Sequence, residues 1–316
     1  MKPKVAIKVS HLKKYFGEIH AIDDISFEVK KGEIFGFLGP NGAGKTTTIN
    51  ILSTLLKPDG GSVSIDGYDV MLEEEAVRQR IGLVFQESIY DDHLTIEENL
   101  YLHSLLYGLN LSQYRHSLRE VLKLVELWDR RKYRLRQLSG GMRRRMEIAR
   151  ALIHQPAILF LDEPTIGLDP QTRNKIWDYI FTVRKEKDQT IFLTTQYINE
   201  AESCDRIAII DNGKIVIIDK PSNLKRLVAS DIISLRTADN DLASEVIERN
   251  WPELRFRRFG RFLEINVENG DEFLPRLIKS MPIKILSVEL HQPTLEDVFL
   301  KLTGRRIREE IEINGG

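Results

Sequence analysis

The sequence predicts an α/β protein with a mostly parallel sheet, an additional antiparallel β part and a small α+β region at its C-terminal end. Short apolar strands alternate with helical stretches between residues 34 and 195, which is typical of a parallel sheet covered by helices. Residues 95–154 interrupt this alternation with an almost wholly helical block, which we expect to be an inserted subdomain. After Pro221 the pattern changes. Because 316 residues correspond to about two domains of roughly 150 residues, we expect domains at 1–224 and 225–316.

The first part of the chain supplies four expected strands. Apolar and polar residues alternate along 5–9 and 25–29, as in strands with one buried face. Ile34–Leu38 is apolar and leads into a glycine-rich loop. The apolar residues after that loop recur at helical spacing as far as Leu56, so we expect that helix to continue to the turn that begins at Lys57. Residues 81–85 form the next expected strand.

Strands and helices also alternate after residue 94. The helical block has one apolar face, formed by Leu118, Val121, Leu122, Val125 and Leu127. Buried strands are expected at 158–161 and 190–195, with a helix between them that starts near Pro170. Two more strands, 206–211 and 214–219, flank Asn212-Gly213, which is a strong signal for a two-residue hairpin turn.

The C-terminal region is expected to form a compact α+β domain. Its strands are expected at 232–236, within 255–267 and at 283–290, and its helices at 242–250 and 272–281. A last helix carries signals at both ends. Thr294 and Asp297 match a capping box, and Gly304 stands where a helix ends.

The composition excludes several classes of protein. Basic and acidic residues number 46 and 47, so the net charge is −1 and binding to nucleic acid by charge alone is not expected. No apolar stretch approaches the roughly 20 residues that cross a bilayer. The single cysteine, Cys204, favours a reducing compartment. We therefore expect a soluble, cytoplasmic chain whose membrane role would come through a partner.

Two arginine-rich segments are interpreted as solvated faces and not as nucleic-acid sites. Arg143–Arg145 is expected to be exposed on a helix and to form i, i+4 pairs with acidic residues such as Glu147. Residues 256–261 interleave Phe with Arg, and we expect a strand pair with one wet face.

A phosphate-binding loop follows the strand Ile34–Leu38. Residues 39–46 match G-x-x-x-x-G-K-[ST], in the strand–loop–helix context that the motif requires. The glycines let backbone N–H groups face the phosphates, together with the positive end of the helix. Lys45 can reach the β- and γ-phosphates, and the Thr46 hydroxyl can ligate Mg²⁺. The expected nucleotide-binding residues are Gly39, Pro40, Asn41, Gly42, Ala43, Gly44, Lys45, Thr46 and Thr47.

Two carboxylates follow the strand at 158–161. Asp162, expected just outside the strand, is suited to hold Mg²⁺ directly or through water. Glu163 could orient or deprotonate the water that attacks the γ-phosphate. Many strands end in acidic residues for solubility, so this assignment depends on the phosphate loop upstream.

Leu138-Ser139-Gly140-Gly141-Met142 resembles the signature motif of ATP-binding cassette (ABC) ATPases. Ser139 with two glycines opens a helix, so its hydroxyl and N–H groups form a second anion site. Taken alone, the motif is also consistent with an ordinary helix N-cap. The resemblance implies that Ser139, Gly140 and Gly141 close over the γ-phosphate at the partner's phosphate loop, with two ATP molecules sandwiched between two copies.

Further motifs of that family occur in its usual order. Gln86 resembles the Q-loop glutamine, for which the resemblance implies roles in catalysis and at the metal ion, and 167–169 resembles the D-loop. Tyr15-Phe16-Gly17 resembles the aromatic loop, which implies that Phe16 stacks on adenine. A buried aromatic at the end of a strand is the alternative for Phe16.

The sequence departs from the family at one position. After the strand 190–195 the family usually has a histidine that touches the γ-phosphate, and this chain has Gln196. A glutamine amide can donate a hydrogen bond to phosphate but cannot become a cation. We expect Gln196 to occupy this catalytic position without titrating.

Within the family the chain resembles the daunorubicin-resistance type of multidrug-export ATPase. The resemblance rests on 194–197, 140–145 and 293–299 and covers nearly the whole chain. It implies an ATP-hydrolysing, Mg²⁺-dependent subunit that pairs with a second copy or a close homologue. It also implies docking on a separately encoded transmembrane permease at the inner face of the cell membrane, through the Q-loop region and the helical block.

Other interpretations stay open. For the C-terminal domain, a regulatory or dimer-stabilising role and simple packing against the ATPase domain are alternatives. For the whole chain, the alternatives are a soluble ABC ATPase without a transport role and a weakly hydrolysing nucleotide-sensing module.

Overall fold

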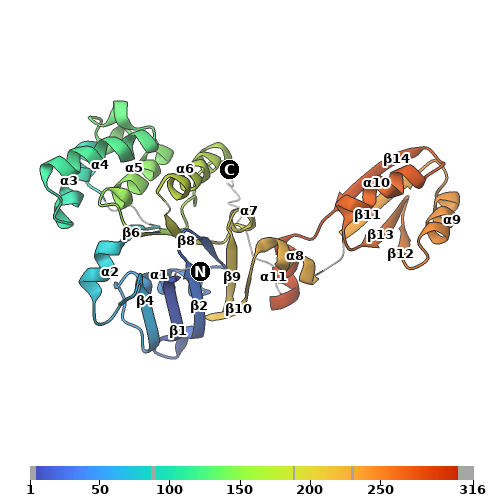
Figure 1. Ribbon diagram of the computed structural model, residues 1–316, viewed down its shortest axis with the longest axis horizontal. Coiled ribbons are helices and arrows are strands. Elements are labelled where there is room, and N and C mark those ends of the chain that lie inside the picture. The colour runs from blue at the N-terminus through green and yellow to red at the C-terminus, as the bar shows by residue number, and fades with distance from the viewer. Residues whose placement is uncertain (1–4, 87–89, 188, 229–230, 305–316) are drawn as a thin grey trace, which may run out of the picture. The chain divides into compact units, whose positions relative to one another are not determined.

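The central sheet has six strands, and all but one are parallel. In the computed structural model, which describes residues 5–86, 90–187, 189–228 and 231–304, the strand order is β10-β9-β3-β8-β7-β6 (Figure 1). Strand β10 is antiparallel to β9 and forms the edge of the sheet. The strands are β3 (Ile34–Leu38), β6 (Ile81–Val84), β7 (Ile158–Asp162), β8 (Thr190–Thr195), β9 (Arg206–Asp211) and β10 (Lys214–Asp219). Every residue of β3, β7 and β8 is buried, which explains their continuous apolar sequences.

A second, antiparallel sheet shares the core of the first. Its order is β2-β1-β4-β5, from β1 (Val5–Phe16), β2 (Ile19–Lys30), β4 (Gly60–Ile65) and β5 (Tyr68–Asp69). The ring of Phe27 in β2 lies 5.7 Å from that of Phe35 in β3 and 6.0 Å from that of Phe192 in β8. Both the parallel and the antiparallel parts expected from the sequence are therefore confirmed.

The block inserted between β6 and β7 is helical, as expected. It contains α3 (Ile96–Leu106), α4 (Leu111–Leu124), α5 (Gly140–Leu152) and two short 3₁₀ turns. Thr95, Asn110 and Ser139 cap the three helices through their side chains. All five residues of the expected apolar face are buried. The remaining helices of this part are α1 (Lys45–Leu52), α2 (Glu74–Arg80), α6 (Pro170–Lys187) and α7 (Ile198–Glu202).

The helix after the phosphate loop is shorter than expected. It ends at Leu52 and does not continue to Leu56. Thr54 adopts a left-handed backbone conformation (φ 66°), and the N–H groups of Leu55 and Leu56 both donate to the carbonyl of Asn50. This turn closes the helix although the apolar spacing continues.

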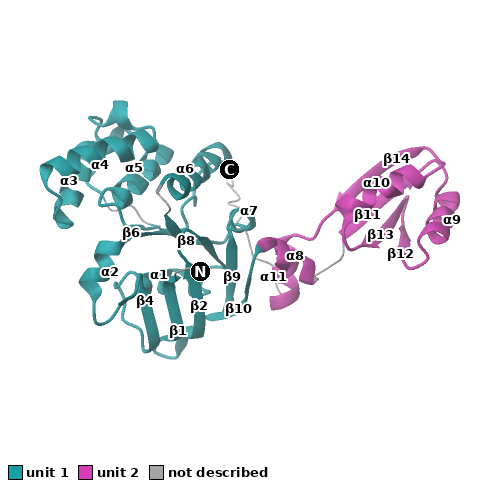
Figure 2. Cartoon of the chain, in the orientation of Figure 1, with its two compact units in different colours: residues 1–220, 307–316 teal, residues 221–306 magenta. Residues whose placement is uncertain are grey.

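The chain divides between Lys220 and Pro221 into two units (Figure 2). The boundary expected at 224/225 falls inside a helix, α8 (Pro221–Val228), which the sequence analysis missed. The second unit continues with β11 (Asp231–Thr237), α9 (Asn240–Asn250), β12 (Arg255–Phe259), β13 (Phe262–Val267), α10 (Gly270–Ser280), β14 (Ile285–His291) and α11 (Leu295–Thr303).

The sheet of the second unit has the order β12-β13-β11-β14, with every neighbouring pair antiparallel. This order and the β-α-β-β-α-β succession define a split βαβ fold. Its core contains Ile233, Leu235, Ile247, Leu263 and Leu277. The two boundary signals of the last helix are confirmed: Thr294 and Asp297 form a capping box at the start of α11, and Gly304 ends it at φ 74°.

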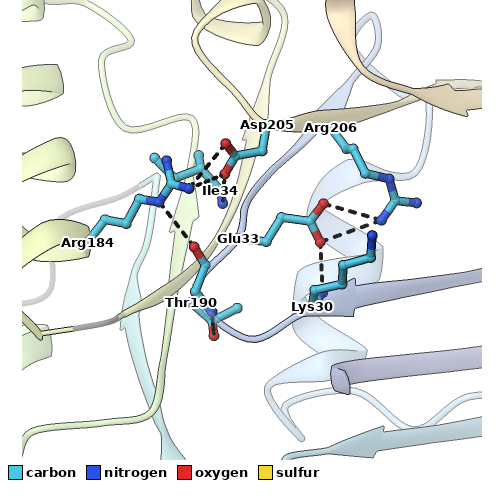
Figure 3. A network of polar contacts seen from close by, with 8 residues as sticks. Lys30, Glu33, Ile34, Arg184, Thr190, Asp205 and Arg206 are labelled. Carbon is cyan, nitrogen blue, oxygen red and sulfur yellow. Dashed lines mark hydrogen bonds and ion pairs between the residues drawn. The ribbon is translucent and has the colours of Figure 1, made fainter. Parts of the chain in front are cut away.

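A polar network joins strand ends at one edge of the central sheet (Figure 3). Arg184 donates to the carbonyl of Gly32 at 3.0 Å and pairs with Asp205 at 2.9 Å. Asp205 also accepts from the N–H of Ile34 at 2.8 Å, and Glu33 pairs with Arg206 at 3.3 Å. The contacts lie at the first residues of β3 and β9, which Arg184 reaches from α6. The opposite ends of the parallel strands face the phosphate loop, where open α/β sheets bind their ligands.

No helix in the described part of the chain is long and apolar enough to span a membrane.

Candidate nucleotide-binding and hydrolysis site

The phosphate loop connects the end of β3 to the start of α1 and depends on glycine at defined positions. Gly42 and Gly44 have φ of 78° and 103°, a region that favours glycine. A Cβ atom at Gly39 would lie 2.3 Å from the carbonyl oxygen of Ile210, and one at Gly44 would lie 2.4 Å from that of Ala21. The loop therefore fits between β2 and β9 only because both residues lack a side chain.

The hairpin turn between β9 and β10 supports this loop. Asn212 and Gly213 both have positive φ (48° and 73°), as the two-residue turn requires. The N–H of Gly213 donates to the carbonyl of Ala43 at 3.1 Å, and the N–H of Asp23 donates to the carbonyl of Gly213 at 2.8 Å. The turn thus links β2 to the phosphate loop.

The Lys45 side chain is buried and points into the loop. Its ammonium donates to the carbonyls of Gly39 at 2.9 Å and Pro40 at 3.1 Å. It also forms an ion pair with Glu163, with 3.1 Å between Nζ and Oε1, and both residues are about 5% exposed. The structure therefore brings together two of the residues expected to act on the γ-phosphate.

Glu163 has a strained backbone that its neighbours hold in place. Its φ is +44°, a left-handed conformation that costs roughly 1–2 kcal/mol for a residue with a side chain. Its N–H donates to the carbonyl and the hydroxyl of Thr194 in β8, at 3.2 and 3.1 Å. Strain of this kind persists where the surroundings enforce it, and it is concentrated at functional sites.

Asp162 and Thr46 offer oxygen ligands to a cation. Asp162 is the last residue of β7 and not, as expected, the first beyond it. Its Oδ1 accepts from the Thr46 hydroxyl at 3.4 Å and from the Thr194 hydroxyl at 2.5 Å. Carboxylate and hydroxyl oxygens beside a phosphate site are the ligands that Mg²⁺ prefers, so these residues fit that ion.

Arg144 contradicts the expectation that Arg143–Arg145 is exposed. It is 8% exposed, so the expected exposure is wrong. Glu147 is a partner as expected, at 2.8 Å, but the pair has i, i+3 spacing and not the expected i, i+4. Its other hydrogen bonds go to main-chain carbonyls at the ends of β6 and β7. Arg145 is half-buried and donates to the Tyr179 hydroxyl at 3.1 Å. The periodicity of the segment gave no sign of this, because three consecutive arginines point in three directions around a helix.

Gln196 directly follows β8, and the threonine before it is held by a buried carboxylate, Glu200, that the sequence did not predict. Gln196 is about 9% exposed. Glu200 in α7 accepts from the Thr195 hydroxyl at 2.6 Å and from the Thr165 hydroxyl, and burial raises the pKa of this carboxyl group. Glu200 thereby joins the segment before Gln196 to the segment after Glu163. The sequence shows Glu200 only as one of two glutamates in a short helical segment, so no local signal could have identified this link.

The signature residues lie at the exposed start of α5. The Ser139 hydroxyl accepts from the N–H of Met142 at 3.3 Å, so the serine is the N-cap of the helix. Ser139 and Gly140 are exposed, and no atom lies within 4 Å of a Cβ atom built at Gly140. Gly141 is closely packed, since its Cβ would lie 2.4 Å from a methyl group of Thr172. An N-cap is therefore present, and its polar groups face outward.

The aromatic loop ends β1. Phe16 is 49% exposed, so the alternative of a buried strand-end aromatic is wrong. Asp59 accepts from the N–H of Tyr15 at 2.6 Å and pairs with Lys14 at 3.1 Å. The hydrogen bond from Tyr15 and, to a smaller extent, the contact with Lys14 lower the pKa of the Asp59 carboxyl group. The ring of Phe16 is thus presented on a fixed main chain.

The other two family motifs are surface segments. Gln86 is exposed and follows Phe85, and the next residues of the Q-loop, 87–89, lie outside the described part. In the D-loop, Gly167 has φ 70°, and Asp169 accepts from the N–H of Thr172 at 3.0 Å at the start of α6.

The comparisons with known proteins agree with this geometry. The family profile described as ABC transporter matches residues 22–166. The chain is 39% identical over 312 residues to the daunorubicin resistance ATP-binding protein DrrA3 of Streptomyces coeruleorubidus, covering 96% of this chain and 98% of the relative. It is 35% identical over 317 residues to the Nod factor export ATP-binding protein I of Paraburkholderia xenovorans (strain LB400), covering 97% and 100%.

A solved structure supports the same assignment. The dimeric structure of MJ0796, a bacterial ABC transporter cassette, matches 68% of this chain and 98% of its own length, at 33% identity and a TM-score of 0.62. The chain belongs to the ABC transporter family, as an ATP-binding subunit. It is an ATPase of the kind that couples ATP hydrolysis to transport.

Proposed function

We propose that this chain powers an exporter and that its hydrolytic residues are Lys45, Glu163, Gln86 and Gln196. The observation that carries this proposal is the buried pair of Lys45 and Glu163, 3.1 Å apart at the end of the phosphate loop. A cation and a carboxylate at this place match the two tasks of phosphoryl transfer, which are stabilising charge on the γ-phosphate and orienting the attacking water.

The metal-binding residues in this proposal are Thr46, Asp162 and Gln86. A bound Mg²⁺ would neutralise the negative charge that develops on the phosphate oxygens. Asp162 has the support of Thr194 for this role, since the threonine hydroxyl donates to the same carboxylate. Residues 39–47 would hold the phosphates and Phe16 would stack on the adenine.

Two copies would close around two ATP molecules. The exposure of Ser139 and Gly140 at a helix N-terminus supports this, because an outward-facing anion site needs a phosphate from elsewhere. The similarity to a cassette whose solved structure is dimeric adds to it. ATP-driven closure and reopening after hydrolysis would then move the permease.

The names of the relatives, which describe drug resistance and Nod factor export, support the proposal of export. The proposed partner is a separate transmembrane permease. The surface proposed for the permease is the region from Gln86 to about His93 together with the helical block. Three leucines on α3 support it, since Leu102, Leu105 and Leu106 are 52%, 49% and 79% exposed. In this position the chain would lie on the inner face of the cell membrane.

For residues 225–316 we propose a role in regulating or stabilising the dimer. The unit has its own apolar core and its own sheet, as a separable module requires. Assembly of the chain without residues 221–316, measured with and without ATP, tests this. Unchanged assembly would contradict the proposal.

The first experiment is ATPase activity at rising protein concentration, for the wild type beside Glu163→Gln. A rate per subunit that climbs with concentration, and that disappears in the variant, is the expected result. With ATP, the variant should bind nucleotide and accumulate as a dimer. A Glu163→Gln protein that stays monomeric with ATP would contradict the sandwich arrangement.

The role of Gln196 has its own test. The pH–rate profile of the wild type should lack an inflection near 6.5 from this position, and Gln196→His should introduce or shift one, because imidazole titrates there. A wild-type rate that Gln196→Ala leaves unchanged would exclude the catalytic role.

A further inference from the structure

We propose that Arg144 is a positioning residue, which fixes the catalytic carboxylate Glu163 and the start of the Q-loop to the signature helix. This inference rests on the proposed role of Glu163 in hydrolysis. Arg144 itself touches no substrate in this scheme.

All five N–H donors of the Arg144 guanidinium have an acceptor. Nε donates to the carbonyl of Pro164 at 2.7 Å, and one terminal nitrogen donates to the carbonyls of Asp162 and Glu163 at 3.1 and 3.2 Å. The other terminal nitrogen donates to the carbonyl of Phe85 at 2.6 Å and to Glu147 at 2.8 Å. Four of the five bonds thus reach main-chain oxygens of two segments that carry chemistry.

The geometry of the group explains why an arginine is needed. Guanidinium presents five donors in a rigid planar fork, whereas the lysine ammonium has three and glutamine has two. Three consecutive carbonyls, at residues 162–164, accept from two nitrogens of this fork. Glu147 forms an ion pair with the buried Arg144 guanidinium, so the buried positive charge has a partner.

Arg144 and Thr194 hold Glu163 from opposite sides. The N–H of Glu163 is fixed by Thr194 and its carbonyl by Arg144. Because Glu163 has a left-handed backbone, these two partners determine the direction in which its side chain leaves the chain, which is toward Lys45. Loss of Arg144 would let this peptide relax and would move the carboxylate.

The same side chain connects three functional segments. Arg144 lies in α5, which begins at Ser139, and its bond to Phe85 ends immediately before Gln86. A shift of the signature helix therefore displaces Glu163 and the start of the Q-loop together. In a sandwich dimer, a subunit whose signature residues engage the partner's ATP would thereby adjust its own hydrolytic site.

The test compares Arg144→Gln and Arg144→Lys with the matched control Arg143→Gln. Arg143 is the neighbouring arginine, and among the described residues its side chain donates to the carbonyls of Leu138 and Arg136 and not to those of Phe85 or residues 162–164. We expect Arg144→Gln to lower kcat by ~10- to 100-fold with KM for ATP within about 3-fold of wild type, because a misplacement of about 1 Å can cost ~100-fold. Arg144→Lys should recover part of kcat, and Arg143→Gln should match the wild type.

A second arm separates positioning from general loss of structure. In the Glu163→Gln background steady-state turnover is lost, so the residual rate is measured in single-turnover assays with enzyme in excess over ATP. Arg144→Gln should change this residual rate by less than about 2-fold, because the group that it positions is already disabled. A further drop as large as in the wild type would overturn the inference. If Arg144→Gln does not fold, as judged by thermal unfolding, the same comparison is made with Arg144→Lys: kcat should be lowered and KM for ATP should stay near the wild-type value.

The two proposals fail in different ways. Wild-type hydrolysis by Glu163→Gln would refute the proposed role of Glu163. An inactive Glu163→Gln protein beside fully active Arg144 variants would refute the positioning role alone.

Discussion

The described parts of the two units differ in whether they bury charged side chains. In the first unit, buried side chains include Lys45, Asp162, Glu163, Arg144 and Glu200. In the described part of the second unit, the buried polar side chains are Ser234 and Thr237, and none is charged. Burying a charge is expensive unless it is paired and hydrogen-bonded. The comparison indicates that the first unit is built to place charges, whereas the second is stabilised chiefly by apolar packing.

The largest effect is expected from breaking the buried ion pair of the first unit. Lys45→Ala should lower the free energy of unfolding of the nucleotide-free protein by about 3–5 kcal/mol, because it leaves Glu163 buried without its partner. ATP hydrolysis should be lost as well. Urea unfolding and an ATPase assay measure the two effects.

An exposed ion pair of the second unit is the control for Lys45→Ala. Arg257 and Glu264 are 2.8 Å apart, and the Arg257 side chain is 72% exposed. Arg257→Ala should change stability by less than about 1 kcal/mol. Equal effects of the two substitutions would show that the proposed contrast between the units is wrong.

The next prediction tests the contribution of apolar packing in the second unit. Ile247 in α9 is fully buried, and Ile247→Ala should destabilise this unit by about 2–5 kcal/mol through lost burial and a cavity. Leu242→Ala in the same helix, where the side chain is 43% exposed, is the matched control. Calorimetry should show the change, and KM for ATP should stay at the wild-type value. A raised KM would mean that this core also serves the nucleotide site.

Two partly buried histidines make the first unit sensitive to acid. Burial, with the nearby Arg150 and His154, lowers the pKa of His103 to about 3. Burial lowers the pKa of His154 to about 4 against the opposing effect of its bond to the Ile81 carbonyl. The ring of His154 also stacks on Tyr107 at 3.6 Å.

Because the unfolded chain binds these protons more readily, the stability contribution of both histidines is complete above about pH 6.5. It is lost as the pH falls toward 4 for His154 and toward 3 for His103. At pH 5 each histidine should cost about 2 kcal/mol, from roughly 1.5 pH units at about 1.4 kcal/mol each. Urea unfolding at pH 7.5 and 5 checks this, with His103→Gln expected to flatten the dependence and the exposed His116→Gln as control. A stability that does not change between these pH values would contradict the prediction.

The smallest effect concerns a single helix cap in the second unit. Thr294→Ala removes the hydroxyl that accepts from the N–H of Asp297 and should destabilise α11 by about 1 kcal/mol. Faster hydrogen exchange of the amides of α11 is the measurement. Thr294→Ser, which keeps the hydroxyl, should exchange at nearly the wild-type rate.

Sequence patterns were sufficient wherever neighbouring residues determine the structure. The strands at 190–195, 206–211 and 214–219, the hairpin turn at Asn212-Gly213 and the capping of α11 follow from short local signals, and the structure has them at those positions. Lys45, Asp162 and Glu163 were predicted as site residues because they stand at the end of a buried strand or of the loop that follows one, and the structure brings them close together.

Contacts between distant residues could not be predicted in this way. Arg144 reaches Phe85 across 59 positions, and Arg184 reaches Gly32 across 152. The burial of Arg144 is decided by the elements that pack around it, and a run of arginines reads as polar surface in any local window. The early end of α1 has the same explanation, because hydrogen bonds to the Asn50 carbonyl and not apolar spacing terminate the helix.

The two hairpin turns that contain Gly213 and Gly260 differ in a way that matters for protein engineering. Both glycines have positive φ, but a Cβ atom at Gly213 would lie 2.8 Å from the carbonyl oxygen of His20, whereas nothing lies within 4 Å of one at Gly260. An epitope tag or fluorescent label inserted at the first turn would push against the strand that flanks the phosphate loop. The second turn is the better attachment point for a reporter, since an insertion there leaves the support of the phosphate loop intact.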